Sequence, residues 1–396
     1  MEVIKRIETR KGANLNLNGI AEKILDKTLS VNTYGLRPDD FFGTTPKLCL
    51  KEGSNILAGT PIFYSKKTPS IKIVSPISGI IKKILRGPKR KIENIIIESS
   101  TNQESITHEV KGWKKMDINN LKQLLMESGN WSFIHQRPYG IMANPLDTPK
   151  SIFVSTAKTD PLREDYHFVL KEDQKEFQLG IDLLNRLVDQ PVFLGLDKSF
   201  PGYFESIEGV QHYSFEGPHP AGNLSLHIQK LSPLNMNDRV WTVNPEDVVN
   251  IGRFISSGVF SPQRTIAVSG NAVTNPKYFK TKIGAELAPI LNKVGIKFDN
   301  VRIINGDVLT GSTALISDYL GYFNNLVTVI PEGSHYRMFG WLPFKDNKIL
   351  SLSNTSFSRL FNRKGFEVDT NLNGEERALV VTGEMEKIFP LDIYPM

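Results

Sequence analysis

The chain has 396 residues, of which 40% are hydrophobic and 23% charged, a composition typical of globular proteins and not of disordered or fibrous ones. This length predicts roughly two to four domains. The net charge of +6 is too small to indicate nucleic-acid binding, and no basic repeat interleaved with aromatic residues supports it. An acidic protein partner and an anionic membrane surface both fit a mildly basic chain.

The sequence predicts no membrane anchor. The N-terminus, MEVIKRIETRKGANLNLNG, lacks the apolar core of a signal peptide. No run of about 18 uninterrupted apolar residues occurs, so we expect no membrane-spanning segment. The single cysteine, Cys49, leaves the chain without a disulfide framework, a thiolate zinc site or an iron–sulfur cluster of its own. We expect Cys49 to be a small buried hydrophobe.

The periodicity of apolar residues changes twice along the chain. Residues 28–100 predict an all-β region, because short β-rich runs alternate with turns. A helical pattern at Ile118–Ser128 follows, and strand–helix alternation from about residue 150 predicts a three-layer α/β unit. The predicted strands are Ser151–Thr156, Pro191–Leu196, His212–Phe215 and Arg239–Val243, and the predicted helices are Glu172–Val188 and Pro245–Ser257. Beyond them, Arg264–Ser269, a turn at Asn275-Pro276 and a helix at Ala285–Val294 predict a small α+β module, and residues 331–396 predict further short strands.

Two glycine-containing stretches, GPHPAG (217–222) and GDVLTGST (306–313), space two glycines as a phosphate-binding Walker loop does. Neither is followed by the lysine that neutralises the phosphates, and no G-x-G-x-x-G fingerprint occurs. A G-x-S-x-G nucleophile elbow is also missing. The sequence therefore argues against nucleotide hydrolysis and against a serine hydrolase.

The densest unusual stretch is SFEGPHPAGNLSLHI, residues 214–228. Glu216, His219 and His227 are candidates for metal ligands or for an acid–base set. The prolines beside His219 favour instead a rigid turn leading into a helix that starts near Pro220-Ala221. A third interpretation is a pocket in which His219 hydrogen-bonds a neutral polar ligand. The acidic pairs Glu164-Asp165, Glu172-Asp173 and Glu246-Asp247 fall mostly at predicted helix starts, where acids offset the helix dipole.

A cluster of six cations follows the turn SPISG, residues 75–79. It consists of Lys82, Lys83, Arg86, Lys89, Arg90 and Lys91. A solvated hairpin and a docking surface for an acidic partner or lipid headgroups are the two interpretations. The turn and its return strand resemble those of biotin- and lipoyl-carrying domains. The position that holds the modified lysine in such domains corresponds to Thr68 in this sequence. Lys66 and Lys67 lie one or two places away, and a slip of one residue reverses the face of a strand, so we expect a carrier scaffold without its attachment point.

Over nearly its whole length the chain resembles the NqrA family, which belongs to the Na+-translocating NADH:quinone reductase. The motifs that carry the resemblance are RKGANLNLNG (10–19), YGLRPDD (34–40), SPISGIIKKILRGPKR (75–90), SFEGPHPAGNLSLHI (214–228), RVWTVNPEDVVNIG (239–252), INGDVLTG (304–311) and PLDIYP (390–395). The string FEGPHPAG is specific to this family. A more distant likeness extends to the corresponding subunit of the Rnf complex and to the flavin-bearing subunit of respiratory complex I.

The resemblance implies a multidomain fold of class α/β and α+β. Its parts are an N-terminal segment with a lipoyl-like barrel-sandwich domain (1–104), a Rossmann-like three-layer α/β domain (105–258), an SLBB-like β-grasp module (259–330) and a C-terminal β-rich segment (331–396). The stretch RTIAVSGNAVTNPKYFKTKIGAELAPIL (264–291) matches the SLBB pattern. Family members continue past PLDI into a helical, cysteine-containing portion, so the resemblance implies a truncated or shortened member.

The resemblance implies a peripheral subunit on the cytoplasmic side of the bacterial inner membrane, with the membrane subunits of the reductase as partners. That complex couples electron transfer from NADH to ubiquinone with sodium export. The chain lacks both the glycine-rich FMN loop of the complex I flavin protein and the cysteine runs of its Rnf counterpart. We therefore expect it to bind no cofactor or metal, with NADH, flavins and an iron–sulfur cluster held by other subunits.

For this chain we expect a role in assembly of the complex and in contact with ubiquinone. A quinone needs an apolar slot with a few hydrogen-bond donors, and the residues of these types are Phe215, Pro218, His219 and His227. The basic cluster at 82–91 is the expected docking edge. The alternatives are a stand-alone flavin- or NADH-binding oxidoreductase, an Rnf-like electron-transfer subunit, or a lysine-linked carrier.

Overall fold

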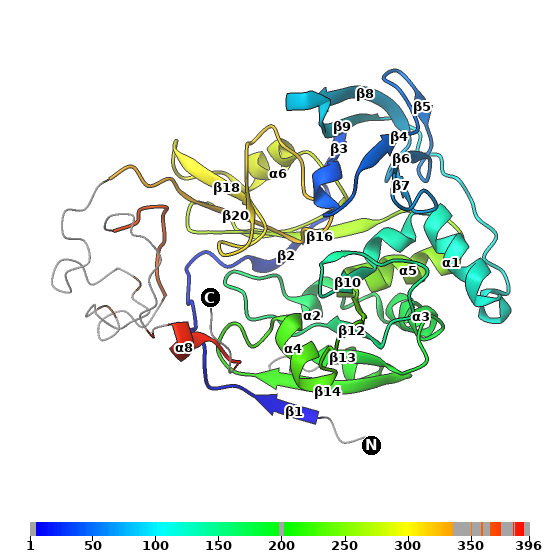
Figure 1. Cartoon of the computed structure of the whole chain (residues 1–396). Coiled ribbons are helices and arrows are strands. Elements are labelled where there is room, and N and C mark those ends of the chain that lie inside the picture. Colours follow the sequence, from blue (N-terminus) through cyan, green and yellow to red (C-terminus); the bar gives the residue numbers. More distant parts are fainter. Residues whose placement is uncertain are drawn as a thin grey trace.

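The structure is a computed structural model that describes residues 5–197 and 202–335, together with positions 350, 358, 365–373, 383 and 385–391. Its described strands form four sheets, of seven, six, four and three strands. In Figure 1 the two small sheets lie beside the six-stranded sheet, and the seven-stranded sheet with its helices lies below them. This mixture confirms the predicted multidomain α/β and α+β fold class.

The predicted all-β region forms the two small sheets. The four-stranded sheet contains β3 (Thr33–Leu36), β9 (Ile92–Ser99), β8 (Gly79–Arg86) and β5 (Asn55–Ile56), the three-stranded sheet contains β4 (Pro46–Leu48), β6 (Pro61–Ser65) and β7 (Lys72–Val74), and 3-10 turns occur at η1 (Pro38–Asp40) and η2 (Pro88–Arg90). Alternation along the strands places Phe63, Ile73, Ile81 and Ile95 in one shared core, each no more than 1% exposed. The two small sheets therefore form one domain, because their apolar residues share a core.

Cys49 is exposed, so the prediction of a buried cysteine is wrong. It directly follows β4, where Lys47 is exposed and Leu48 is half-buried. Because side chains alternate between the two faces of a strand, Cys49 shares the solvent-facing side with Lys47.

The seven-stranded sheet has the order β1-β14-β13-β12-β15-β10-β11. Its strands are β1 (Lys5–Glu8), β10 (His135–Arg137), β11 (Ile141–Met142), β12 (Ser151–Ser155), β13 (Val192–Leu196), β14 (Val210–Glu216) and β15 (Val240–Thr242), and its helical segments are η3 (Trp113–Lys115), α1 (Ile118–Glu127), η4 (Asn130–Phe133), α2 (Tyr166–Val169), α3 (Gln174–Asn185), η5 (Tyr203–Ser206), α4 (Leu224–Leu231) and α5 (Pro245–Ser257). The five strands from β1 to β15 in this order are parallel, and β10 and β11 are antiparallel. Chain order reverses between β12 and β15, which makes that pair the switch point of a doubly wound sheet.

Neighbouring residues of β12 show why the sheet needs helices on both faces. Phe153 packs in a cluster with Leu226 and Ile228 of α4. Its neighbours Ile152 and Val154 belong to the main core together with residues of α3 and α5. A strand buried on both faces requires a layer on each side, so the predicted three-layer unit is present.

The six-stranded sheet has the order β19-β18-β20-β16-β17-β2 and contains the predicted α+β module. Its elements are β2 (Glu22–Asp26), β16 (Gln263–Ser269), β17 (Lys277–Lys282), α6 (Leu287–Val294), β18 (Val301–Asn305), β19 (Ser312–Ala314) and β20 (Leu326–Pro331). Strands β16 and β17 form the antiparallel hairpin expected around Asn275-Pro276.

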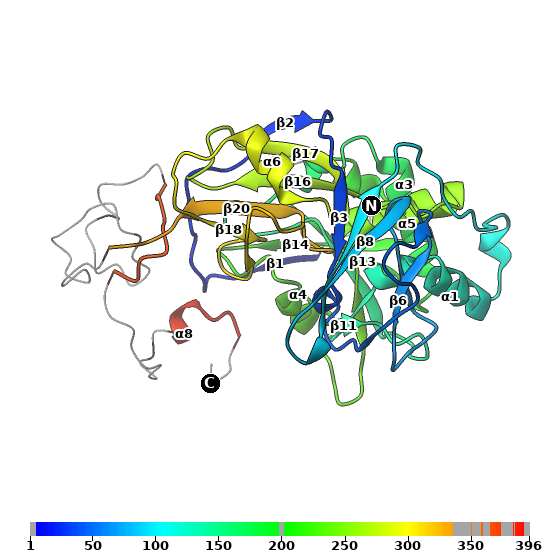
Figure 2. The ribbon, with the colours of Figure 1, turned by 90° about the horizontal axis from the view of Figure 1, so that it is seen from above.

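The N-terminal segment belongs to two sheets that are built mainly from distant residues. Strand β1 pairs in parallel with β14, and β2 pairs in parallel with β17. Figures 1 and 2 show the blue chain between them passing along one side of the molecule. Residues 9–21 therefore connect the α/β sheet to the β-grasp sheet.

Of the C-terminal tail, the described positions include α8 (Met385–Ile388) and a bridge from Phe366 to Leu17. The further short strands predicted for 331–396 otherwise fall outside the described residues. Within the described part of the chain, every helix is too short or too polar to cross a bilayer.

Candidate functional site

Two adjoining cavities, of about 300 and 640 Å³, lie where the α/β sheet meets the β-grasp module, and we call them together the cleft. The two cavities share Lys158, Asp160, Thr310 and Phe323 as lining residues. The larger cavity lies beyond the carboxyl ends of β12 and β15. Doubly wound sheets bind their ligands at this switch point, so the cleft is the candidate site.

The loop after β12 is held by a buried ion pair. Lys158 Nζ lies 2.5 Å from Glu164 Oε1, and the ammonium lies over the Tyr166 ring, 5.1 Å from its centroid. Burial lowers the pKa of Lys158, but the neighbouring Glu164 carboxylate outweighs burial and the net shift is upward. Asn244 donates to the Tyr166 hydroxyl at 2.7 Å, which ties this loop to the start of α5. The floor of the cleft is therefore preorganised.

The family-specific string at 214–228 packs its backbone against two other segments. Ala13 N–H donates to the His219 carbonyl at 2.8 Å, and Gly222 N–H donates to Thr159 Oγ1 at 2.9 Å. A Cβ on Gly222 would lie 2.5 Å from Thr159 N, so a side chain there would force the two loops apart. The expected turn is present, and its helix, α4, begins at Leu224, a few residues later than predicted.

Two of the four residues predicted to contact quinone are part of the core. The rings of Phe215 and His227 stack with centroids 4.0 Å apart, and both residues are buried. His227 Nδ1 lies 3.0 Å from the Tyr213 hydroxyl, and Nε2 lies 2.8 Å from the Ala221 carbonyl. Burial lowers the pKa of His227 to about 4, so its ring is neutral. These contacts occupy both nitrogens of His227 within the chain.

The other two, Pro218 and His219, lie half-buried in the turn. His219 Nδ1 lies 3.1 Å from Thr159 Oγ1 and 3.9 Å from Asp160 Oδ1. Its Nε2 has no hydrogen-bond partner among the described residues. None of the four predicted residues lines the cleft, but residues 222–225, which lie between His219 and His227, do.

The metal-ligand interpretation of this stretch gains no support from the geometry. Glu216 pairs with Arg6, at 2.5 Å, and not with either histidine. Within the described ranges, no group of three His, Cys, Asp or Glu side chains is arranged to hold a metal ion.

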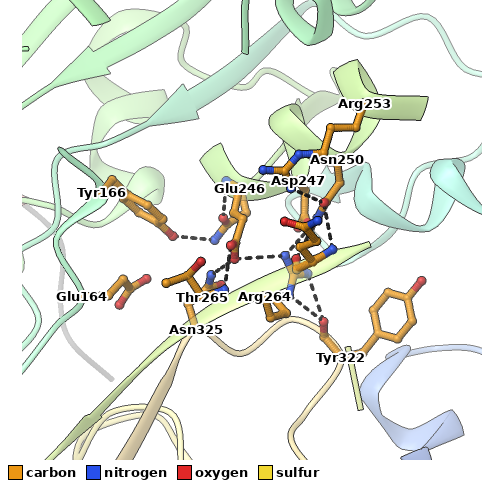
Figure 3. A network of polar contacts seen from close by, with 12 residues as sticks. Glu164, Tyr166, Glu246, Asp247, Asn250, Arg253, Arg264, Thr265, Tyr322 and Asn325 are labelled. Atoms are coloured by element: carbon orange, nitrogen blue, oxygen red, sulfur yellow. Dashed lines mark hydrogen bonds and ion pairs between the residues drawn. The ribbon is translucent and has the colours of Figure 1, made fainter. Parts of the chain in front are cut away.

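A buried ion cluster joins α5 to β16, and Figure 3 shows it from close by. It consists of Glu246, Asp247 and Arg264, and we call it the junction cluster. Arg264 Nη1 lies 2.6 Å from Asp247 Oδ1 and 3.7 Å from Glu246 Oε2. Arg264 is 0% exposed, and its Nε and Nη2 donate to the Tyr322 carbonyl at 3.3 and 3.0 Å. The cluster therefore links helix, strand and β-grasp loop.

Further hydrogen bonds satisfy Glu246 and extend the network. Thr265 N–H donates to Glu246 Oε1 at 2.7 Å, and the Asn325 amide donates to Oε2. Burial raises the pKa of Glu246 to about 7, although Arg264 and Thr265 act against the shift. Tyr322 N–H donates in turn to Asp40 Oδ2 at 2.9 Å, which brings the barrel-sandwich domain into the same network.

Arg137 lines the larger cavity from β10, and His135 lies beside it on the same face of the strand. The Arg137 Nε atom is buried without a hydrogen-bond partner in the described part of the chain. Burial lowers the pKa of Arg137. Burial also lowers the pKa of His135, to about 4, with Arg137 adding to the shift, so His135 is neutral.

All six cations of the predicted basic cluster are found on the β8–β9 hairpin, and each of them is exposed. Lys82 pairs with Glu98 at 2.7 Å, and Lys91 pairs with Asp39 at 2.6 Å. Lys89 and Arg90 adopt positive φ at the tip. Among the residues that the structure describes, the other four cations have no acidic partner, so the tip is a concentrated positive surface.

Sequence reasoning missed the junction cluster and Arg137. It placed Glu246 and Asp247 correctly at a helix start but assigned them only to the helix dipole. The signal that could have found the cluster is an arginine, Arg264, inside the apolar strand QRTIAVS, since a buried cation requires a buried acid. No comparable signal marks Arg137.

Three family models match successive parts of the chain. They are the NqrA N-terminal barrel-sandwich hybrid domain at residues 7–100, the NqrA second alpha/beta domain at 116–260 and the NQRA C-terminal domain at 265–315. The chain is thus a three-part protein of barrel-sandwich, α/β and SLBB domains, in agreement with the predicted fold class.

Curated relatives match almost the whole chain. The NqrA protein of the Na(+)-translocating NADH-quinone reductase of Alcanivorax borkumensis is 33% identical over 98% of this chain and 87% of its own length. Its counterpart in Rhodopirellula baltica is 32% identical over 97% of this chain and 85% of its own. The chain belongs to the NqrA family of Na(+)-translocating NADH-quinone reductase subunits.

Among solved structures, the NAD+-reducing [NiFe]-hydrogenase in its air-oxidized state aligns with 61% of this chain and 53% of its own, at 13% identity. Its TM-score of 0.39 is too low to establish a shared fold.

Proposed function

We propose that this chain serves as the peripheral NqrA component of a sodium-translocating NADH–quinone reductase, on the cytoplasmic side of a bacterial inner membrane. The complex couples electron transfer from NADH to ubiquinone with sodium export. This chain contributes assembly and a contact with quinone, and the flavins and iron–sulfur cluster lie in the other subunits. The observation that carries the proposal is the similarity to a curated NqrA protein over 98% of the chain.

The proposal is tested in the organism's own membranes. Deleting the gene is expected to abolish sodium-stimulated NADH–quinone reduction, and a tagged copy is expected to restore it and to co-purify with integral membrane subunits. The purified chain alone is expected to be colourless and to leave NADH unoxidised. A yellow protein that oxidises NADH unaided would favour a stand-alone oxidoreductase instead.

The quinone contact is proposed at the turn formed by 215–219, with His219 as the group that reaches the ligand. Its Nε2 is without a partner among the described residues, and Phe215, Pro218 and His227 shape the turn that carries it. We expect His219→Ala to weaken binding of a ubiquinone analogue at least about five-fold, because a hydrogen bond to a carbonyl is lost. The matched control is His212→Ala. It removes a histidine of β14 whose ring is bonded to the Phe204 carbonyl, away from the turn. Equal affinity in both variants would exclude this placement.

The docking edge is proposed at the basic hairpin tip, which supports contact with an acidic surface of a membrane subunit. Reversing charge at Lys89, Arg90 and Lys91 is expected to reduce co-purification of the membrane subunits several-fold, more strongly at low salt. The matched control is Lys66→Glu with Lys67→Glu, two exposed lysines on a different loop of the same domain. Loss of assembly in the control alone would place the docking edge elsewhere.

A further inference from the structure

Among the residues that the structure describes, one cation of the cleft has no counterion. Arg137 lines the larger cavity, its Nε is buried and unbonded in the described part of the chain, and no carboxylate offsets the effect of burial on it. Two other charges of the same cavity are paired, Lys158 with Glu164 and Asp247 with Arg264, and Asp160 is a further carboxylate in its wall. Arg137 is half-buried, and a guanidinium with a buried, unbonded Nε and no acid beside it suits a ligand that supplies the anion.

The start of α4 lies in the wall of the same cavity, and its first amides have free donors. The N-cap residue, Asn223, makes no side-chain capping bond. Leu224 and Ser225 line the cavity, and their N–H groups find no acceptor among the described residues. Free helix-start amides and an arginine are the donors with which proteins hold phosphate groups.

The remaining walls suit the rest of such a ligand. Phe323 lines both cavities and is half-buried, and its ring packs edge-to-face with that of His135, with the centroids 4.5 Å apart; it offers an aromatic surface to the cleft. Asp160, shared by both cavities, offers a carboxylate to hydroxyl or amine donors. The larger cavity, at about 640 Å³, falls within the range of small-molecule sites.

We propose that the cleft binds a phosphate ester of the nucleoside monophosphate class, with its phosphate on Arg137 and the start of α4 and its ring against Phe323. The site uses a switch-point cleft without the glycine fingerprint, which is why sequence motifs do not reveal it. This inference goes beyond the proposed function and does not depend on quinone binding or on complex assembly.

The test is calorimetric titration of the purified full-length chain with AMP and, separately, with inorganic phosphate. We expect AMP to bind more tightly than phosphate and phosphate to compete with it. Arg137→Gln is expected to weaken both at least about ten-fold, and Arg137→Lys to recover part of the loss. The matched control, Arg239→Gln, removes an arginine that lies over the Tyr139 ring and does not line the cleft, and it should leave both affinities unchanged.

Phe323→Leu distinguishes recognition of the ligand's ring from recognition of its phosphate. It should weaken AMP about five-fold or more and leave phosphate binding intact, since stacking on an aromatic ring is lost. Thermal unfolding of each variant without ligand verifies that it is folded. Failure of the wild-type chain to bind AMP at millimolar concentration, or equal AMP affinity in Arg137→Gln and Arg239→Gln, would overturn the proposal. Phosphate binding as tightly as AMP would overturn the assignment to a nucleoside ester.

Discussion

At the scale of single residues, Glu246 is the group of the junction cluster whose protonation we expect to change near neutral pH. Burial raises its pKa from 4.5 to about 7, so the folded protein holds this proton more tightly than the unfolded chain. Protonated Glu246 therefore adds roughly 3 kcal/mol to the free energy of unfolding. This stabilisation is fully present below pH 4.5 and is lost as pH rises through 7. We predict that Glu246→Gln removes this part of the pH dependence, as measured by urea unfolding between pH 5 and 8. The control is Glu172→Gln at an exposed position, and parallel pH curves for wild type and Glu246→Gln would contradict the prediction.

Arg264 is the residue on which the junction cluster depends. Replacing it with methionine would leave Asp247 buried without its cation, which lies 2.6 Å away in the wild type. We predict a loss of about 3–5 kcal/mol in the free energy of unfolding. Adding Asp247→Asn should recover part of that loss, because the uncompensated charge is then gone. A double variant no more stable than Arg264→Met would show that packing, and not charge pairing, dominates at this site.

The sequence could predict where these residues stand but not what they face. The predicted helix Pro245–Ser257, with proline at its start, located Glu246 and Asp247 at a helix start. Their partner Arg264 follows on a strand, and a helix-start pattern carries no information about which strand returns against it. The prediction that Cys49 is buried was wrong for a related reason. The residue type favoured burial, but the register of the strand places Cys49 on the solvent side.

At the scale of elements, the crossing of α3 and α5 depends on two glycines. A Cβ on Gly252 would lie 1.8 Å from the Glu176 carbonyl oxygen, and one on Gly180 would lie 2.1 Å from that of Val248. Alanine favours helix by about 1 kcal/mol over glycine, but here its methyl group would separate the two backbones. We predict that Gly252→Ala destabilises the protein by about 2 kcal/mol or more, as measured by urea unfolding. Ser256→Ala, on the exposed side of the same helix, should change stability by less than about 0.5 kcal/mol, and an equally mild Gly252→Ala would refute the tight crossing.

Elements with strong local signals were predictable, and those that depend on distant partners were not. The helix Pro245–Ser257 has the predicted bounds, because Pro245 marks its start and Gly258, with φ 73°, ends it. Strands β1 and β2 have four and five residues and a mixed polar pattern, so periodicity does not identify them. They exist because β14 and β17 lie beside them in the fold.

At the scale of the whole molecule, two of the most distinctive sequence motifs pack against each other. RKGANLNLNG and FEGPHPAG meet where Ala13 N–H donates to the His219 carbonyl, and a Cβ on Gly12 would lie 2.3 Å from that oxygen. The same N-terminal segment continues to Gly19, whose carbonyl accepts from Gly270 N–H at 2.7 Å in the β-grasp module. Much of the distinctive sequence is therefore explained by interdomain packing, and the cleft lies beside that contact.

The contribution of the N-terminal segment to the α/β sheet can be tested by removing residues 1–9. The deletion takes away β1, so β14 becomes an edge strand, and the bond from Thr9 N–H to the Glu216 carbonyl, 2.9 Å long, is lost. We predict that amides of β14 exchange with solvent at least about ten-fold faster and that stability falls by about 1–3 kcal/mol, because hydrogen bonds and the half-buried Ile7 are lost. Amides of β18, in the other large sheet, provide the internal control and should keep their protection, since none of their partners lies in the deleted segment. Unchanged exchange in β14 would show that β1 contributes nothing to the sheet, and faster exchange in both sheets would show that the N-terminal segment stabilises the two domains as one cooperative unit.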